Sequence, residues 1–434
     1  MSIILSLMKY RLRPFLLALI AASAVIGFGT SYVIAQGNSE PSSEPTMDKP
    51  ASVSHSHVLA SAEARLAAAI ARYQVIAAAG GWPHVPPGPS IKPGYHDNRV
   101  PLIRVALHTM GDYTGELSDS TLYDADVQQA VARFQERHGQ EPDGALGKRT
   151  LEQMNVPVEL RIAQMQASLE QMQAMAEPQD ERYVLVNVAG YYLEAVQDGT
   201  PVLISRVIVG DRKNPTPLFT NAITDVQFNP SWHVPKRIAA EEIAAKMRRD
   251  PDYLVRAGFT VTDSSGGSVD PSTIDWSQVS KKHFPYRIRQ RPGEENALGK
   301  IKFNIPDDYD VYLHSTSTPK LFAKADRALS HGCVRVQQAR ALAYFLMQGM
   351  AGWDRTRIDQ AYDGSASRVV RLENPVPVYL VYWPSWVDDA NTVHFHPDIY
   401  DRMKSRSAEL QDQQVAPGTS LTAVRYLDAS LRRN

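Results

Sequence analysis

The sequence predicts an α+β protein in which a small helical unit precedes a mostly β domain that carries an insertion. Between residues 101 and 155, apolar residues recur at the spacing of amphipathic helices. From about residue 183 the pattern changes to short β-rich runs separated by turn residues. Residues 229–298 interrupt that pattern, which indicates an insertion. A chain of 434 residues has room for two or three such domains.

Composition excludes some classes of function. Apolar residues make up 43% of the chain and charged residues 21%, as in an ordinary globular protein. The formal net charge is −1, whereas a nucleic-acid-binding protein usually shows a basic excess. We therefore expect no nucleic-acid partner.

The N-terminus predicts export. An apolar run over residues 15–28 follows three basic residues: Lys9, Arg11 and Arg13. With Val-Ile-Ala at residues 33–35, this is the order of a secretory signal. Residues 15–35 are also about long enough to span a bilayer, with the basic end held in the cytoplasm. Because the cleavage pattern at Ala35 is only fair, residues 1–35 are expected to be a signal peptide or, slightly favoured, a retained anchor.

The next segments lead to the helical unit. Residues 36–58 are rich in Ser, Pro and Glu and predict a disordered linker. Residues 59–98 predict an Ala-rich helical segment, ended by Gly80-Gly81, and a proline-rich connector. Residues 99–156 predict a compact module of three helices. Residues 157–181 predict a connecting helix, on which a stripe of apolar residues is expected to fill the core: Met165, Leu169, Met172 and Met175.

Residues 182–401 predict the β domain, and residues 402–434 a C-terminal tail. Asp198-Gly199 is a strong signal for a hairpin turn. The expected strands cover residues 183–188, 191–196, 201–209, 302–305, 310–314 and 376–381. Helices are expected over residues 238–249, within the insertion, and over residues 339–350.

The chain has a single cysteine, Cys333, which cannot form an internal disulfide. An exported disulfide scaffold would carry several cysteines, so the core must depend on hydrophobic burial. The thiol lies in the segment Ser-His-Gly-Cys-Val-Arg-Val, residues 330–336, and His314 lies nineteen positions upstream. A thiol beside histidines is the minimum equipment for covalent acyl transfer.

A catalytic cysteine needs a partner that accepts its proton. His314 ends a predicted strand, which would aim its side chain with little freedom. Gly332 permits a tight turn and lets the amides of Gly332 and Cys333 converge on one point, as an oxyanion hole requires. Ser330 and His331 are expected to hold that turn. In a strand, Arg335 would share a face with the thiol and add positive charge.

Other interpretations of these residues stay open on spacing alone. A lone cysteine is most often a small buried hydrophobe, and a lone histidine is more often structural than a base. His314, His331 and Cys333 are also the residue types that bind zinc. Against zinc, His331 and Cys333 are only two residues apart and no second ligand pair accompanies them.

The longer pattern resembles the L,D-transpeptidases with a YkuD-type catalytic domain. The segments His314-Ser315-Thr316 and Ser330-His331-Gly332-Cys333 resemble the signature of that family. Further segments resemble its larger, YcbB-like Gram-negative branch: residues 229–235, 289–293, 296–299, 312–314 and 395–400. In one departure, Gln337-Gln338 stand where many members have Asn. Four pairs within residues 101–155 resemble a helical peptidoglycan-binding module: Tyr123-Asp124, Phe134-Gln135, His138-Gly139 and Asp143-Gly144.

The resemblance implies a β-sandwich catalytic domain with a capping subdomain at about residues 229–298, acting in the periplasm without a cofactor or metal. Cys333 would take the acyl group of one tetrapeptide stem with release of D-Ala, and the amine of a second stem would resolve the thioester as a 3→3 crosslink. His314 would move the protons, and the amides at Gly332 and Cys333 would hold the oxyanion. His331 is a further candidate catalytic residue, although a structural role in the turn is favoured for it. Inhibition by carbapenems is also implied.

The remaining expectations concern contacts and rival activities. The candidates for substrate contact are Arg335, Ser330, Tyr312 and Trp232, with a core role equally open for Trp232. Glycan strands would bind the helical module, and the inner membrane would hold a retained anchor. The alternatives are an L,D-carboxypeptidase, in which water replaces the amine, a non-catalytic peptidoglycan-binding protein and, more weakly, a zinc peptidase.

Overall fold

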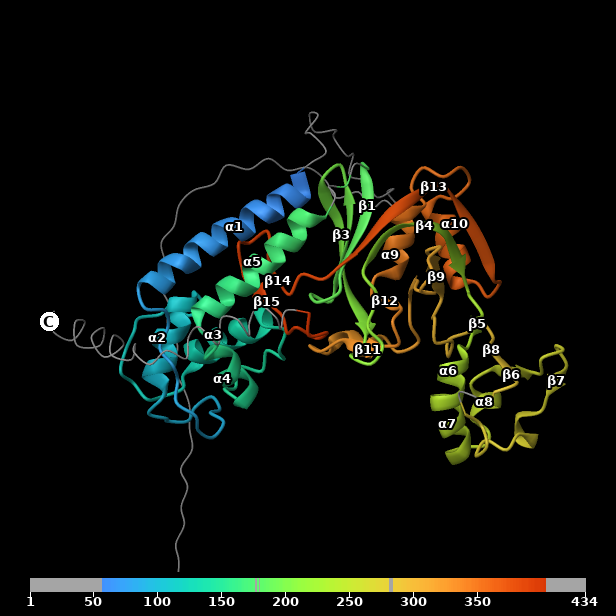
Figure 1. Ribbon diagram of the computed structural model, residues 1–434, viewed down its shortest axis with the longest axis horizontal. Helices are drawn as coiled ribbons and strands as arrows, with labels where there is room; N and C mark the ends of the chain where they lie inside the picture. Colours follow the sequence, from blue (N-terminus) through green and yellow to red (C-terminus); the bar gives the residue numbers. More distant parts are fainter. Residues whose placement is uncertain (1–56, 176–177, 179, 281–283, 403–434) are drawn as a thin grey trace, which may run out of the picture. The chain divides into compact units, whose positions relative to one another are not determined.

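The computed structural model describes residues 57–175, 178, 180–280 and 284–402 (Figure 1). The predicted signal or anchor, nearly all of the linker and nearly all of the C-terminal tail lie outside the described residues. Among the helices in the described ranges, none has the length and apolar character needed to cross a bilayer.

The helical unit consists of α2 (Val100–Met110), α3 (Ala125–Arg137) and α4 (Lys148–Met154). These helices bury their own apolar cluster, in which Ile103, Leu107 and Val127 are fully buried. The Asp124 carboxylate caps α3 by accepting the Val127 N–H at 3.0 Å, which satisfies a donor that the first helical turn leaves free. The predicted three-helix module is therefore confirmed as a fold.

Two long helices link this unit to the sheet. α1 (His57–Ala78) and α5 (Val158–Ala174) pack side by side (Figure 1). Their apolar faces bury a shared cluster that includes Leu66, Met165 and Met172. The methionine stripe is thus core, as predicted. The same cluster includes residues of the hairpin formed by β14 (Ser385–Val387) and β15 (Val393–Phe395).

The helical unit contacts the β14–β15 hairpin directly. Arg137 forms a buried ion pair with Asp112 and donates to the Val393 carbonyl at 3.4 Å. Gly139 lies against His396 so closely that an added Cβ would come within 3.2 Å of the imidazole. The His138-Gly139 pair thus has a packing role, because a larger residue would push the two segments apart.

Within the described residues, the β domain is built on a nine-stranded sheet in the order β11-β3-β12-β10-β9-β4-β13-β1-β2. β2 also pairs with β3, so the sheet closes on itself. The mostly β domain that the sequence predicts is therefore confirmed. The strands are β1 (Arg182–Asn187), β2 (Tyr192–Gln197), β3 (Thr200–Gly210), β4 (Phe219–Phe228), β9 (Ile301–Asn304), β10 (Leu313–His314), β11 (Ala328–Ser330), β12 (Val334–Val336) and β13 (Arg368–Val381).

One face of this sheet and two helices enclose the largest apolar core. α9 (Ala339–Leu346) and α10 (Arg355–Asp363) supply the helices. Phe303, Leu313 and Val334 are fully buried in this core on three adjacent strands. Burial of each such side chain contributes roughly 1.5–3 kcal/mol relative to exposure. Since side chains alternate along a strand, the residues that directly precede and follow each of these three point to the opposite face.

The strand expected at residues 376–381 begins earlier, at Arg368 of β13, and three further strand predictions differ from the structure. β4, which pairs with both β13 and β9, was not predicted, because its Thr, Asn and Asp residues hide the alternation of apolar residues. The strand expected at residues 310–314 shortens to Leu313–His314, since Asp310 has φ +57°. Tyr191, also at φ +57°, precedes β2 rather than beginning it. The hairpin turn at Asp198-Gly199 is confirmed, with φ +50° and +72°.

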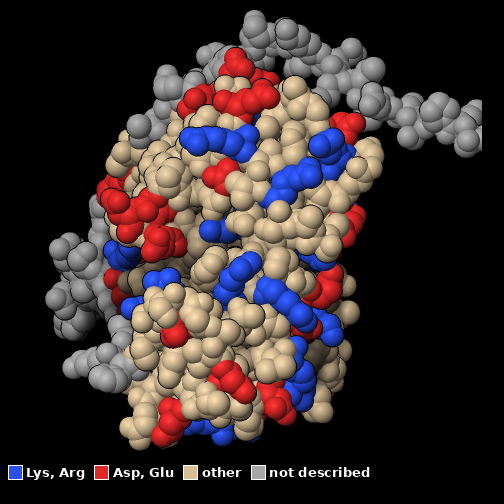
Figure 2. Space-filling model, turned by 90° about the vertical axis from the view of Figure 1, so that its right-hand side faces the viewer, with Lys and Arg blue, Asp and Glu red and all other residues tan. Residues whose placement is uncertain are grey.

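The insertion folds as a small subdomain with its own core. Its sheet, in the order β5-β8-β6-β7, contains β5 (Trp232–His233), β6 (Phe259–Thr262), β7 (Ser268–Val269) and β8 (Arg287–Gln290). A helical run comprises α6 (Lys236–Ile238), a π-helical turn (Ala239–Ile243) and α7 (Ala244–Arg249), followed by α8 (Tyr253–Arg256). Met247, Leu254 and Ile288 are buried in its apolar cluster. The face in Figure 2 carries both signs of charge, with basic side chains gathered near its middle.

Candidate active site

Strand register brings four of the predicted site residues to one face of the sheet. β10 and β12 run parallel, with Leu313 beside Val334 and His314 beside Arg335. Leu313 and Val334 point into the core, so Tyr312, His314, Cys333 and Arg335 are placed on the opposite face. The next strand, β9, sets Lys302 beside His314. The thiol and the imidazole thus come from neighbouring strands at one polar surface.

The turn before Cys333 is closed by Ser330 and Gly332. The Ser330 hydroxyl donates to the Cys333 carbonyl at 2.6 Å and accepts the Gly332 N–H at 3.2 Å. Gly332 has φ +118°, a backbone conformation that L side chains rarely adopt. These contacts explain why the sequence places Ser and Gly on either side of His331.

Two of the sequence expectations change here. Ser330, a candidate for substrate contact, is 3% exposed, and its hydroxyl donates to the Cys333 carbonyl, which is the turn-holding role also expected for it. The Gly332 amide, expected to share an oxyanion with Cys333, already donates to Ser330 in this structure. The spacing of these residues in the sequence does not show that their polar groups are already used by hydrogen bonds within the turn.

The insertion reaches this face through two polar contacts. Nε2 of His331 pairs with the Glu242 carboxylate, which lies in the π-helical turn. Trp232 lies close enough to the Tyr312 phenol to act against the rise in its pKa that burial causes first. Trp232 also packs against the apolar cluster of the insertion, which is the core role considered for it. The insertion is therefore tied to the Cys333 segment and to the neighbouring strand.

The environment of Cys333 keeps the thiol protonated. Burial raises the pKa of Cys333 above its usual value. Acting in the opposite direction, the backbone N–H and the phenol of Tyr312 donate to the sulfur, and Lys302 adds positive charge. The thiol itself donates to the Asp310 carbonyl at 3.7 Å. The thiol is therefore protonated at rest and would have to lose its proton to act as a nucleophile.

His314 is neutral near pH 7. Burial, followed by the positive charge of Arg335, lowers the pKa of His314 to about 3. Hydrogen bonds to the backbone carbonyls of Ser315 and Leu298 act in the opposite direction. Nδ1 is buried without a hydrogen-bond partner in the structure. A neutral ring with an unused nitrogen can accept a proton, which is what a general base requires.

Two cations border the thiol and the imidazole. The Lys302 ammonium lies 4.0 Å from the centroid of the Tyr312 ring, and burial lowers the pKa of Lys302. Burial likewise lowers the pKa of Arg335, against the charges of Cys333 and Glu242. Nε of Arg335 is buried without a partner. These groups can bind carboxylates or stabilise negative charge that develops at the site.

Sequence reasoning missed Lys302 and Glu242. Lys302 had a signal, because Lys-Phe-Asn-Ile at residues 302–305 alternates polar and apolar residues and so exposes Lys302 on the polar face. Glu242 had none, because its partner His331 is distant in sequence and the contact depends on how the insertion folds. Within the described residues, no cluster of three or more His, Cys, Asp or Glu side chains has the arrangement of a metal site.

Comparison with known proteins supports this architecture. Residues 181–370 match the family model of the YkuD "L,D-transpeptidase catalytic domain", and residues 96–154 match that of a "Putative peptidoglycan binding domain". The chain therefore contains a YkuD L,D-transpeptidase catalytic domain together with a peptidoglycan-binding domain. Domains of these two families imply an extracytoplasmic location.

Individual proteins are also similar to parts of this chain. A Haemophilus influenzae protein named "Putative L,D-transpeptidase" is 39% identical over 217 residues, which are 50% of this chain and 44% of that protein. The chain thus spans less than half the length of that curated relative. The L,D-transpeptidase of Stackebrandtia nassauensis is 15% identical and covers 67% of this chain and 94% of its own, with a TM-score of 0.27. The E. faecium catalytic domain acylated by ertapenem is 12% identical and covers 47% of this chain and 99% of its own, with a TM-score of 0.22.

Proposed function

We propose that this chain is a peptidoglycan L,D-transpeptidase that forms 3→3 crosslinks through a thioester on Cys333. The observation that carries the proposal is that Cys333 and His314 share one face of two adjacent strands, with the thiol protonated and the imidazole neutral. The matched catalytic and peptidoglycan-binding domains supply the substrate class.

In the first half-reaction, Cys333 attacks the carbonyl that links the L-centre of diaminopimelate to the terminal D-Ala of a tetrapeptide stem. His314 takes the thiol proton as the C–S bond forms, then delivers it to the nitrogen of D-Ala as the C–N bond breaks. The products are a thioester and free D-Ala. The buried, neutral ring suits this role, because it can be protonated transiently and returned to its resting state.

In the second half-reaction, the side-chain amine of a second stem attacks the thioester. His314 takes a proton from that amine and returns it to the departing sulfur, which restores the thiol and leaves an amide between two diaminopimelate residues. The Cys333 amide and the nearby cations Lys302 and Arg335 would stabilise the oxyanion of both steps. The Gly332 amide would join them only by leaving Ser330.

The insertion favours transfer over hydrolysis. Through Glu242 and Trp232 it contacts the two segments that carry the thiol and the phenol. A cover that excludes water protects the thioester until an amine arrives. An L,D-carboxypeptidase is the second candidate function. It is expected if the insertion is loose enough for water to reach the thioester.

An enzyme with this activity would be exported and would be inhibited by carbapenems. The N-terminal segment would direct export across the inner membrane or anchor the chain in it. The helical module would bind glycan strands, and the enzyme would act in the periplasm. The E. faecium relative is acylated by ertapenem. We expect a carbapenem to acylate Cys333 in the same way.

The test is incubation of residues 50–434 with purified tetrapeptide muropeptides, followed by mass spectrometry, in the wild type and in Cys333→Ala. We expect a crosslinked tetra–tri dimer and released D-Ala from the wild type only. Tripeptide without dimer would establish a carboxypeptidase. No conversion, together with retained binding to peptidoglycan, would establish the non-catalytic alternative.

A further inference from the structure

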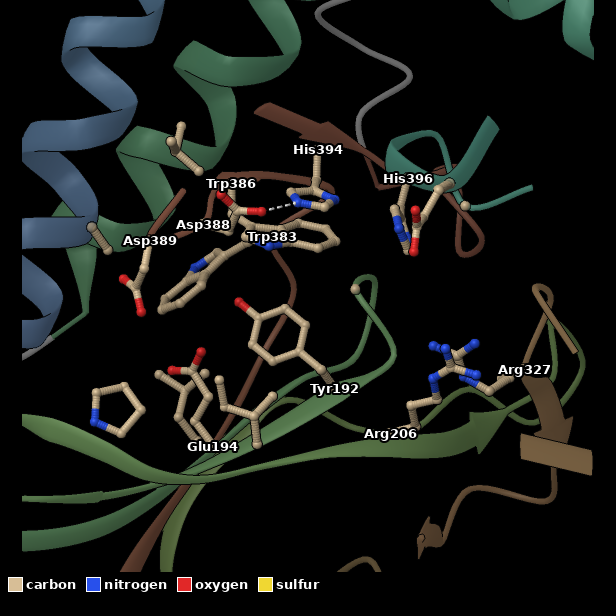
Figure 3. Close-up of a pocket in the computed structure, with 18 of the residues that line it drawn as sticks. Tyr192, Glu194, Arg206, Arg327, Trp383, Trp386, Asp388, Asp389, His394 and His396 are labelled. Atoms are coloured by element: carbon tan, nitrogen blue, oxygen red, sulfur yellow. Dashed lines mark hydrogen bonds and ion pairs between the residues drawn. The ribbon is translucent and has the colours of Figure 1, made fainter. Parts of the chain in front are cut away.

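A cleft of about 810 Å³ is lined by residues other than those of the Cys333 site (Figure 3). Neither Cys333 nor His314 lines it. The β2–β3 hairpin forms one side, and the β14–β15 hairpin forms another (Figure 3). Residues 139–142, just after α3 of the helical unit, contribute a further wall. The volume is that of a site for a small organic ligand, and it is built from both matched domains.

Strand register gives this cleft opposite charges at its two ends. In the β2–β3 pair, Tyr192 lies opposite Arg206 and Glu194 lies opposite Ile204, so these four side chains share one face. Figure 3 shows Glu194 and Asp389 toward one end, Arg206 and Arg327 toward the other, and Tyr192 between them. The cleft is therefore dipolar along its length.

The acidic end contains a carboxylate with no direct partner. Among the described residues, no hydrogen bond or ion pair is formed by the Glu194 side chain, although Arg65 lies within electrostatic range. Arg65 itself pairs with Asp389 at 3.3 Å, and Asp388 is taken by His394 at 2.8 Å. Burial, and then the charge of Asp389, raises the pKa of Glu194 to about 7. A partly buried carboxylate left in this state is stabilised when a cation binds beside it.

The basic end contains two neighbouring guanidinium groups. Arg327 is 9% exposed and donates to the backbone carbonyls of Val207, Lys324 and Tyr191. Arg206 donates to the Phe322 carbonyl at 3.3 Å. Within the described part of the chain neither forms an ion pair. Burial, and then the charge of Arg206, lowers the pKa of Arg327 to about 10. An anionic ligand would relieve the repulsion between the two cations and could be held by paired N–H donors.

Aromatic side chains lie between the charged ends. The Trp386 ring lies 5.2 Å from the Tyr192 ring and stacks on His394 at 4.8 Å. Trp383 also lines the cleft and is almost fully buried. Rigid aromatic surface of this kind contacts the apolar parts of a ligand at small entropic cost.

We propose that this cleft binds a short zwitterionic peptide, with an ammonium group at Glu194 and carboxylates at Arg206 and Arg327. Resting on the proposed function, we take that peptide to be a stem of peptidoglycan, held at a second site while another stem reacts at Cys333. A stem that contains diaminopimelate carries both an amine and carboxylates. A neutral saccharide has no group to pair with either charged end, so it fits less well.

The probe is the tripeptide L-Ala-γ-D-Glu-meso-diaminopimelate, which lacks the terminal D-Ala that would leave. Its affinity for the full chain is measured by calorimetry, beside that of the same tripeptide with acetylated amines. We expect acetylation to weaken binding about tenfold in the wild type and less than about twofold in Glu194→Gln, because both changes remove the same ion pair. Amidation of the peptide carboxyls paired with Arg206→Gln is expected to show the same coupling.

Glu373→Gln is the matched control, because Glu373 is an exposed residue of β13 and does not line the cleft. Equal affinities in Glu194→Gln and Glu373→Gln would overturn the proposal. So would a peptide-free disaccharide that binds more tightly than the tripeptide, which would identify a glycan site. Carbapenem acylation of Cys333 is expected to be unchanged in Glu194→Gln. If the wild type is not acylated, the proposed function fails, while the coupling between peptide amine and Glu194 can still be measured.

Discussion

The Thr216 hydroxyl donates to the Gly332 carbonyl at 2.7 Å, which ties the loop between β3 and β4 to the turn that carries Cys333. Thr216 is fully buried and also accepts the Gly210 N–H at 2.9 Å. Its own N–H donates to the Tyr400 phenol at 3.0 Å. The geometry at the thiol therefore depends on segments from both ends of the β domain.

Thr216→Val is expected to lower the free energy of unfolding by about 1–3 kcal/mol, because it leaves the Gly332 carbonyl and the Gly210 N–H without a buried partner. Carbapenem acylation of Cys333 should slow by about tenfold, a barrier increase of about 1.4 kcal/mol. Stopped-flow absorbance and denaturant unfolding measure the two effects. Thr216→Ser keeps the hydroxyl and should behave almost as the wild type. Equal acylation rates in Thr216→Val and the wild type would contradict this role.

Gly332→Ala separates backbone strain from steric conflict. An added Cβ would meet nothing closer than the Pro215 carbonyl at 3.9 Å, yet φ is +118°. We expect a stability loss of about 1–3 kcal/mol, due to strain alone, and a large fall in acylation as the turn relaxes. Gly349→Ala is the control, since Gly349 has φ +81°, open space around it and no contact with the site. A similar loss of stability without loss of acylation is expected there.

The pH dependence of acylation should reflect the buried imidazole. With the pKa of His314 at about 3, the base is already neutral far below pH 6.5. The carbapenem acylation rate is therefore expected to show no inflection near pH 6.5, and its acid limb should lie below about pH 4. A limb centred near the ordinary histidine value of about 6.5 would contradict this environment.

The same pKa shift predicts a stability effect. The His314 pKa is lower in the folded chain than in the unfolded chain, so between about pH 3 and the unfolded value of about 6.5 the unfolded state binds more protons. Above pH 6.5 His314 is neutral in both states and does not change the free energy of unfolding. As the pH decreases through this window, that free energy falls. His314→Gln should unfold with a shallower loss between pH 6.5 and 4 than the wild type, measured in denaturant. Identical slopes would show that His314 does not contribute.

Local pattern was sufficient for the parts of the site that lie close together in sequence. Gly332 beside Cys333 implies a tight turn, and the positive φ confirms it. The alternation of polar and apolar residues around Lys302 was sufficient to predict its position on the polar face, although Lys302 was not among the predicted site residues. Glu242 could not be predicted, because pairing it with His331 requires knowing how a separate small core packs. β4 was missed because its buried positions do not alternate cleanly with polar ones.

The contact between Glu242 and His331 should govern the choice between amine and water. Glu242→Gln removes the charge from this link without changing the thiol, so acylation by a carbapenem should stay within about twofold of the wild type. The ratio of crosslinked dimer to tripeptide should fall, because a looser insertion admits water to the thioester. Mass spectrometry of the muropeptide products gives this ratio. Glu241→Gln is the matched control, since Glu241 is the neighbouring residue and lies 3.9 Å from Arg237 instead. If both variants keep the wild-type ratio, the insertion does not act through this contact, and water must be excluded by the apolar packing around Trp232.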